Sequence, residues 1–160
     1  MILEKDFQEF IELLNKHKVA YMIVGAHALA FHGKPRHTGD LDIWINPTDE
    51  NANKMLLVIN DFGFGSVGLK KEDFLREHYV TQLGYPPLRI DILNSISGVA
   101  FEEAYNNRLF IDVDDLTISY IGLGDLIKNK AGTARKQDIA DLENLYKLAG
   151  SSKTKSDKKK

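Results

Sequence analysis

The chain of 160 residues contains no cysteine. Without cysteine it cannot form a disulfide framework or a thiolate metal site, and we expect an intracellular, cytoplasmic protein. No apolar run approaches the roughly 20 residues that span a bilayer. The first residues also lack a basic stretch followed by an apolar one. We therefore expect neither a signal peptide nor a membrane partner.

A large excess of either charge is also absent, because the formal net charge is −2 at pH 7. The charge is nevertheless uneven. Residues 151–160 hold five lysines and one aspartate, so residues 1–150 carry about −6. An acidic body disfavours a broad nucleic-acid groove. The polar lysine-rich tail is predicted to be disordered, serving either solubility or contact with RNA or another polyanion.

The remaining 150 residues hold enough apolar side chains for one domain with one core. Their periodicity predicts helices alternating with short strands, and hence an α/β (α+β) fold with a small mixed sheet flanked by helices. The predicted strands are 19–24, 41–45, 79–83 and 88–93, with a hairpin of 109–113 and 116–121. The predicted helices are 3–17, 26–32, 49–62, 71–76, 97–106, 123–131 and 133–148.

The carboxylates of Asp40 and Asp42 are separated by one residue at the start of the predicted strand 41–45. Because alternate residues of a strand share a face, Asp40 and Asp42 point the same way, with Cα atoms ~6.5 Å apart. Such a pair repels itself and has no packing role. A divalent cation between them removes the conflict, and two cations can hold a triphosphate and its acceptor for in-line displacement.

A third acid, Asp91, lies among aliphatic residues of the predicted strand 88–93. Adjacent strands lie ~4.8 Å apart, so the three carboxylates can converge if the two strands are neighbours. Asp91 could then orient or deprotonate an attacking hydroxyl. The alternative is a salt bridge with Arg89, which lies two residues away on the same face.

The order of these features resembles the DNA polymerase β-like nucleotidyltransferase superfamily, and within it the abortive-infection type E toxin-related (AbiEii-like) group. The resemblance covers roughly residues 5 to 148. It rests on the glycine turn of Ile23–Ala28, the stretch His32–Asp42 with its Asp-x-Asp pair, the later acid, and two blocks near the end, Leu126–Ala131 and Arg135–Leu142.

The resemblance implies a nucleotidyltransferase-like fold whose C-terminal helices close a cleft. It also implies that Asp40, Asp42 and Asp91 are the catalytic acids and bind magnesium, with manganese as a substitute. Gly25 and Ala26 would form a turn whose backbone N–H groups receive a phosphate.

Four further residues complete the implied nucleotide site. Lys130 and Arg135 would reach the triphosphate or the acceptor, or could instead form ion pairs with Asp138 and Asp141. Arg36 could neutralise a phosphate or pair with Asp40. Thr38 could contact the nucleotide or cap the start of the strand.

The implied activity is metal-dependent transfer of a nucleoside monophosphate from an NTP to an acceptor, in a setting that includes toxin–antitoxin systems. The acceptor could be an RNA 3′ end, a protein hydroxyl or a small molecule. One alternative is an inactive module that binds nucleotide or protein. Another is a partner protein, such as an antitoxin, that uses the Phe7/Phe10 helix or the Trp44 face.

Histidine and tryptophan residues near the acids suggest further roles. His27, His32 and His37 could form a zinc site, but the five-residue spacing of the first two favours packing. Trp44 could stack on a base, although a half-buried sheet residue is the alternative.

Overall fold

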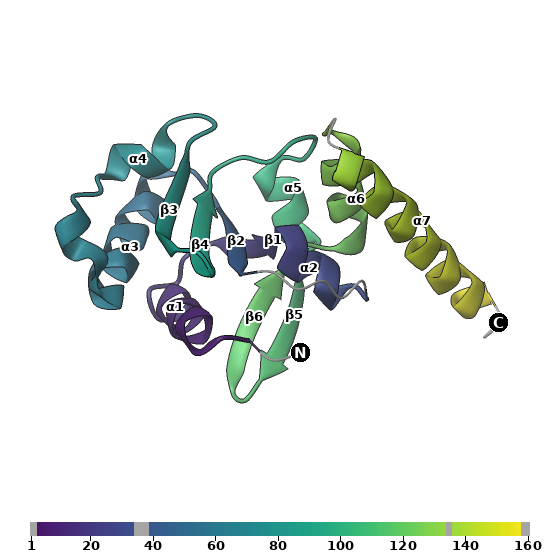
Figure 1. Ribbon diagram of the computed structural model, residues 1–160, viewed down its shortest axis with the longest axis horizontal. Helices are drawn as coiled ribbons and strands as arrows, with labels where there is room; N and C mark the ends of the chain where they lie inside the picture. The colour runs from purple at the N-terminus through teal and green to yellow at the C-terminus, as the bar shows by residue number, and fades with distance from the viewer. Residues whose placement is uncertain (1–2, 34–38, 134–135, 158–160) are drawn as a thin grey trace.

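The computed structural model describes residues 3–33, 39–133 and 136–157. In this part of the chain a six-stranded mixed sheet has the order β3-β4-β2-β1-β6-β5 (Figure 1). The strands are β1 (Tyr21–Val24), β2 (Asp40–Ile45), β3 (Val80–Tyr85), β4 (Leu88–Leu93), β5 (Leu109–Val113) and β6 (Leu116–Tyr120). The α-helices are α1 (Lys5–Lys16), α2 (Gly25–Phe31), α3 (Asp49–Ile59), α4 (Lys71–Leu75), α5 (Phe101–Asn106), α6 (Leu123–Ala131) and α7 (Lys136–Asp157). The mixed α/β fold is thus the one that the sequence predicts.

The middle of the sheet joins strands that are distant in sequence. β2 lies between β1 and β4, antiparallel to the first and parallel to the second. β3 covers the outer side of β4, and β6 pairs with β1 in parallel. The predicted hairpin of β5 and β6 forms the other edge, and its turn residues Asp114 and Asp115 both have positive φ. The pairing of β2 with β4 is what makes a shared acidic site geometrically feasible.

The two faces of the sheet are covered by different helices. The apolar side of α1, with Phe7 and Phe10 buried, packs on the face that carries Leu83 and Ile90. On the opposite face Trp44 is 1% exposed and meets Phe101 of α5 edge to face, with ring centroids 5.1 Å apart. Burying large apolar groups on both faces supplies the main driving force for folding.

Several helix boundaries differ from the predicted ones. α3 ends at Ile59 and continues as a π turn (Asn60–Phe64) because Gly63 has φ +98°. α5 begins only at Phe101, since Gly98 has φ +75° and packs against the end of α6. α7 runs to Asp157, into the lysine-rich segment for which the sequence predicts disorder. Lysine propagates a helix well, and no proline interrupts this segment.

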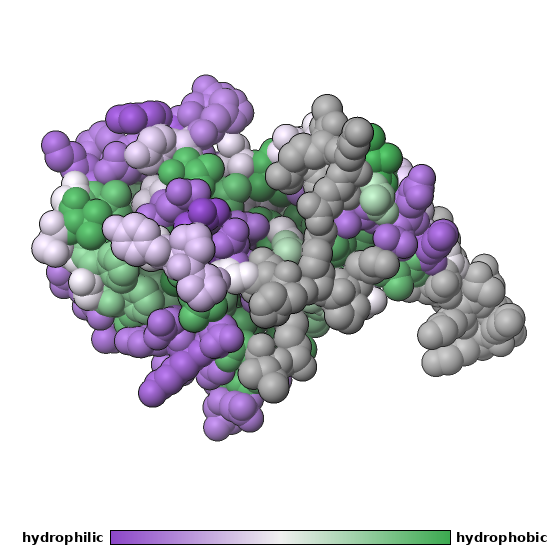
Figure 2. All heavy atoms as spheres, viewed as in Figure 1, coloured by the Kyte–Doolittle hydropathy of each residue, from purple (hydrophilic) through white to green (hydrophobic). Residues whose placement is uncertain are grey.

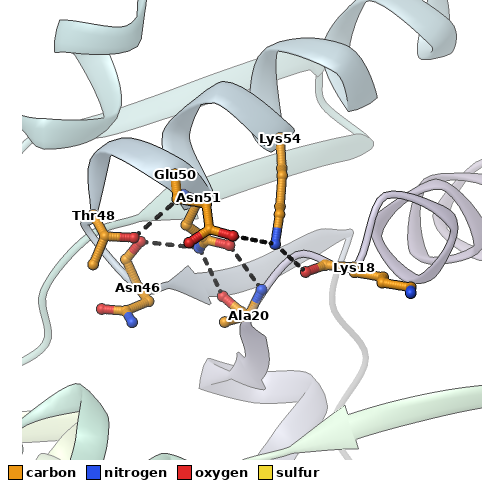
Figure 3. Close-up of polar contacts among 7 residues, drawn as sticks. All are labelled: Lys18, Ala20, Asn46, Thr48, Glu50, Asn51 and Lys54. Carbon is orange, nitrogen blue, oxygen red and sulfur yellow. Dashed lines mark hydrogen bonds and ion pairs between the residues drawn. The ribbon is translucent and has the colours of Figure 1, made fainter.

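A buried asparagine joins α3 to the sheet (Figure 3). The Asn51 side-chain oxygen accepts from the backbone N–H of Ala20 at 2.8 Å, and its nitrogen donates to the carbonyls of Ala20 and Asn46 at 3.0 and 2.9 Å. Thr48 caps the same helix by accepting from the Asn51 backbone N–H at 3.2 Å. These bonds fix the start of β1 and the end of β2 relative to each other, and so help to set the position of β2.

The outer surface is mixed in polarity. Figure 2 shows hydrophilic residues around the rim of the part that contains α3 and α4, with hydrophobic residues between them. In Figure 1, α7 extends away from the sheet beyond α6. No helix within the described ranges is long and apolar enough to cross a membrane.

Candidate functional site

Three carboxylates come together where β2 and β4 run side by side. In the register of these parallel strands, Asp42 lies opposite Asp91 and Asp40 lies opposite Arg89. Because both strands alternate in phase, all four of these side chains occupy one face of the sheet. The structure therefore brings the predicted acids together, and it also places the positively charged guanidinium of Arg89 among them.

Arg89 forms an ion pair with two of the acids. Its Nε and Nη2 donate to the two carboxylate oxygens of Asp91 at 2.8 and 3.0 Å. Nη2 also donates to Oδ2 of Asp40 at 3.3 Å. The salt bridge that the sequence offered as an alternative role for Asp91 is thus present within the acid cluster. A planar guanidinium matches a carboxylate in this two-pronged way, which a lysine could not do.

Asp42 is the acid whose charge is most disfavoured. Burial, together with the nearby charges of Asp91 and Asp40 and a hydrogen bond with Asp91, raises the pKa of Asp42 to about 7, while Arg89 opposes the rise. Near neutral pH, with no cation bound, the Asp42 carboxyl is therefore partly protonated. A cation that binds next to it would favour the ionised form.

The acids line an open cavity of about 540 Å³. Its walls come from the sheet, from the loop that follows β4 and from the end of α6. The lining residues are Val24, Gly25, Asp40, Asp42, His78, Tyr79, Val80, Arg89, Asp91, Leu93, Ser95, Ile96, Ser97, Asn129, Lys130 and Thr133. A volume of this size lies within the range of small-molecule and cofactor sites.

Gly25 is required by its contact with Asp42. It begins α2 with φ +69°, and a Cβ atom at this position would lie 2.1 Å from Oδ2 of Asp42. Only glycine combines this backbone conformation with such a close approach. Ala26 follows as the second residue of α2 and is half-buried. The predicted glycine turn therefore lies directly beside the acids.

Lys130 lines the same cavity from α6. It is buried, and its Nζ lies 3.6 Å from Oδ2 of Asp141 on α7. One predicted alternative for Lys130, an ion pair with Asp141, is thus present. Its location in the cavity also places it within the predicted nucleotide site. Arg36, Thr38 and Arg135 lie outside the described residues.

The sequence reasoning missed two polar residues that line the cavity, His78 and Ser95. His78, which precedes β3 with φ +59°, has its Nδ1 3.0 Å from Oγ of Ser95 and its Nε2 3.3 Å from Glu77. Ser95 lies two residues beyond the end of β4, where strand alternation no longer fixes the direction of its side chain. No sequence pattern marks His78.

Other predicted roles are not supported by the residues' positions. The Trp44 ring packs in the core, and its Nε1 is buried, so Trp44 does not stack on a bound base. His27 packs edge to face against Phe7, and Nε2 of His32 lies 2.8 Å from the carbonyl of Ile121, while His37 lies outside the described residues. Burial also removes the Phe7/Phe10 helix and the Trp44 face as partner surfaces, because both are part of the core.

The acid cluster fits a divalent cation only in part. Asp40 and Asp42 supply the hard oxygen ligands that Mg²⁺ prefers, and the absent side chain of Gly25 leaves room for the Asp42 carboxylate itself. Arg89 already engages both oxygens of Asp91. Within the described ranges, no group of three acidic or histidine side chains is arranged to hold one ion.

A comparison with family models decides the affiliation of the chain. Residues 3–150 match the model of a family described as a nucleotidyltransferase of unknown function (DUF6036). The chain belongs to this nucleotidyltransferase family. No curated protein matches the sequence at a significant level.

Solved nucleotidyltransferase structures share the fold. The lincosamide antibiotic adenylyltransferase LnuA, bound to lincomycin, matches with a TM-score of 0.54 and 16% identity over 92% of this chain and 98% of that one. A putative nucleotidyltransferase from Thermotoga maritima matches at 0.50 and 13%, over 96% and 88%. An antigenic nucleotidyltransferase-like protein from Paracoccidioides brasiliensis matches at 0.54 and 16%, over 91% and 78%. At these identities the likeness establishes the fold.

Proposed function

We propose that the protein transfers a nucleoside monophosphate from an NTP to an acceptor hydroxyl, in a reaction that depends on a divalent metal ion. The observation that carries the proposal is the placement of Asp42 opposite Asp91, with Asp40 on the same face, in a cavity that Gly25 and Lys130 also line. Family membership supports the same reaction class.

In this proposal each described residue has a defined task. Asp40 and Asp42 would hold magnesium, or manganese in its place, which would neutralise charge on the phosphates. The backbone N–H groups of Gly25 and Ala26 and the ammonium of Lys130 would bind the triphosphate.

The chemical step forms one bond and breaks one. The acceptor oxygen attacks the α-phosphorus, the bond from the α-phosphorus to the oxygen that bridges to the β-phosphate breaks, and pyrophosphate leaves with that oxygen. Asp91 would receive the proton of the hydroxyl, since a carboxylate keeps lone pairs available beyond those that an arginine occupies.

The acceptor in the proposal is a small molecule in preference to RNA. LnuA, which is an adenylyltransferase bound to lincomycin, shares the fold. The charge of about −6 on residues 1–150 disfavours the binding of an RNA strand along their surface. A protein hydroxyl carries no such charge and is the second choice.

A labelling experiment tests the proposal. The purified protein is incubated with each α-labelled NTP and Mg²⁺, together with a pool of hydroxyl-bearing small molecules, with cell protein or with total RNA. We expect label transfer that EDTA and Asp42→Asn abolish. Asp115→Asn is the matched control, because Asp115 lies exposed in the β5–β6 turn at a positive φ that asparagine tolerates.

Two outcomes would contradict the proposal. Tight NTP binding without transfer to any pool indicates a nucleotide-binding module, and absence of NTP binding excludes the nucleotidyltransferase reaction itself.

The resemblance to the abortive-infection type E group extends the proposal to a toxin role. Induced expression of the wild type, but not of Asp42→Asn, should then arrest cell growth. Equal growth of the two cultures would contradict the toxin role.

A further inference from the structure

The Arg89 guanidinium is built into the acid cluster of the proposed catalytic site. It contacts both oxygens of Asp91 at 2.8 and 3.0 Å and Oδ2 of Asp40 at 3.3 Å. The Arg89 and Asp91 side chains are largely enclosed, with 26% and 11% exposed, whereas 44% of the Asp40 side chain is exposed. An arginine keeps its charge at every physiological pH, so this cation is permanent.

The charges around Arg89 leave room for one divalent ion. Before a nucleotide binds, and with Asp42 ionised by the bound ion, three carboxylates and one guanidinium sum to a charge of about −2, which a single Mg²⁺ balances. A second Mg²⁺ would place two further positive charges beside a guanidinium in a partly buried site. That repulsion works against a second ion unless Arg89 moves away from Asp91.

The ligands lead to the same conclusion. A two-metal site needs oxygens from several carboxylates to bridge ions roughly 3.5–4 Å apart. The arginine fork leaves lone pairs on both Asp91 oxygens, but an ion bound there would lie next to the guanidinium and be repelled by it. In agreement, the described side chains include no trio of acids or histidines arranged around one point.

We propose that the site takes one divalent cation per bound nucleotide, on Asp40 and Asp42, and that Arg89, held by Asp91, takes the place of a second ion. This inference rests on the proposed nucleotidyl transfer and specifies its metal requirement. Arg89 is then a positioning residue, because it fixes Asp91 and supplies constant positive charge at the acid cluster. Asp91 has the double task of anchoring Arg89 and receiving a proton.

The number of bound ions tests the proposal directly. Free Mn²⁺ is measured by its electron paramagnetic resonance signal while protein, saturated with a non-hydrolysable α,β-methylene NTP analogue, is titrated with MnCl₂. The wild type should bind one Mn²⁺ per chain. Arg89→Met, which has no charge but a similar stem, should bind two, because Asp91 is released to act as a ligand.

Two further variants distinguish an effect of the Arg89 charge from an effect of the substitution on folding. Arg89→Lys keeps the positive charge that repels a second ion and should still bind one Mn²⁺, so a count of two in this variant would contradict the charge argument. Arg108→Met is the matched control. The Arg108 guanidinium stacks 3.5 Å from the Tyr105 ring, and neither residue lines the acidic cavity, so the count should stay at one.

The possible results are distinguishable. Two Mn²⁺ ions per wild-type chain would overturn the single-ion proposal and leave nucleotidyl transfer intact. A count that stays at one in a folded Arg89→Met would also overturn it, because Arg89 would then not exclude the second ion. Absence of both analogue and Mn²⁺ binding by the wild type would overturn the single-ion proposal together with the proposed function.

Discussion

At the scale of single residues, Asp42 links the stability of the protein to its proposed function. Its carboxyl lies on a strand between two other acids and against Gly25, where ionisation is costly. Such a group is unfavourable for the empty protein and useful for binding a cation. Strained or electrostatically unfavourable positions of this kind are concentrated at functional sites.

The pKa of Asp42 predicts how stability depends on pH. In the folded protein this pKa is about 7, whereas the ordinary value is 3.8. Between these values the folded state holds a proton that the unfolded state has lost, so stability falls as pH rises from about 4 to 7. The loss should be on the order of a few kcal/mol.

Denaturant unfolding in EDTA at pH 5 and pH 8 checks this prediction. Asp42→Asn should exceed the wild type in stability by a larger margin at pH 8 than at pH 5, because the amide never ionises. Added Mg²⁺ should stabilise the wild type more at pH 8 than at pH 5. Equal stability of the two proteins at pH 8 would contradict the prediction.

Substitution of Gly25 is predicted to displace the Asp42 carboxyl by steric overlap. Gly25→Ala places a Cβ 2.1 Å from Asp42 Oδ2 at a positive φ, so the carboxylate or the start of α2 must move. We expect a loss of about 2 kcal/mol or more in the free energy of unfolding. Mn²⁺ binding should weaken about tenfold or more, which corresponds to ~1.4 kcal/mol.

A second glycine on a helix provides the control for this prediction. A Cβ on Gly124 of α6 would meet no atom within 4 Å. Gly124→Ala should therefore leave Mn²⁺ binding unchanged and stabilise the protein slightly, by up to ~1 kcal/mol. If both variants bind Mn²⁺ like the wild type, Gly25 does not support the position of Asp42.

At the scale of elements, the fold could be predicted from the sequence where the signal is local. The apolar run ending at Val24 and the alternation after Asp40 correspond to β1 and β2. The Asp114-Asp115 turn correctly marks the β5–β6 hairpin. Helix ends were less predictable, because the late start of α5 depends on a tertiary contact of Gly98 with α6.

The arrangement of the candidate site could be predicted only as far as the chemistry of its residues. Alternation places Arg89 and Asp91 on one face, but whether Asp91 lies beside Asp40 and Asp42 depends on the pairing of β2 with β4. That pairing is long-range and leaves no periodic signal. Alternation also places Trp44 on this face, but it does not show that α5 covers the ring there and makes it unavailable to a base.

The ion pair between α6 and α7 allows a prediction that separates structural from functional roles. Lys130 and Asp141 are both buried, and Nζ lies 3.6 Å from Oδ2. Lys130→Met removes the ammonium beside a buried carboxylate and should cost about 3–5 kcal/mol. The double variant Lys130→Met/Asp141→Leu should recover most of that loss, since it removes both charges.

Nucleotide binding then distinguishes the two roles of Lys130. We expect the double variant to fold with a melting temperature near that of the wild type and to bind NTP at least tenfold more weakly, as measured by calorimetry. Unchanged NTP affinity in this variant would show that Lys130 only joins the two helices.

At the scale of the whole molecule, the uneven charge predicts where RNA can bind. The first 150 residues carry about −6, while residues 151–160 carry five lysines. Among the residues whose burial the structure describes, the last buried apolar side chain is that of Leu145 on α7, and residues 151–160 contain no apolar residue. Removal of residues 151–160 should therefore leave the melting temperature within about 2 °C of the full-length value. Contact with a polyanion should be confined to the tail.

Fluorescence anisotropy with labelled single-stranded RNA checks whether RNA contact is confined to residues 151–160. If all five lysines of the tail contact phosphates, the affinity of the full-length chain should fall roughly 100-fold between 50 and 200 mM salt. The truncated chain should show no binding at either salt concentration, yet transfer label to a small-molecule acceptor at the full-length rate. Equal RNA affinity of the two chains would place the RNA contact on the acidic body. The preference for a small-molecule acceptor would then lose its electrostatic basis.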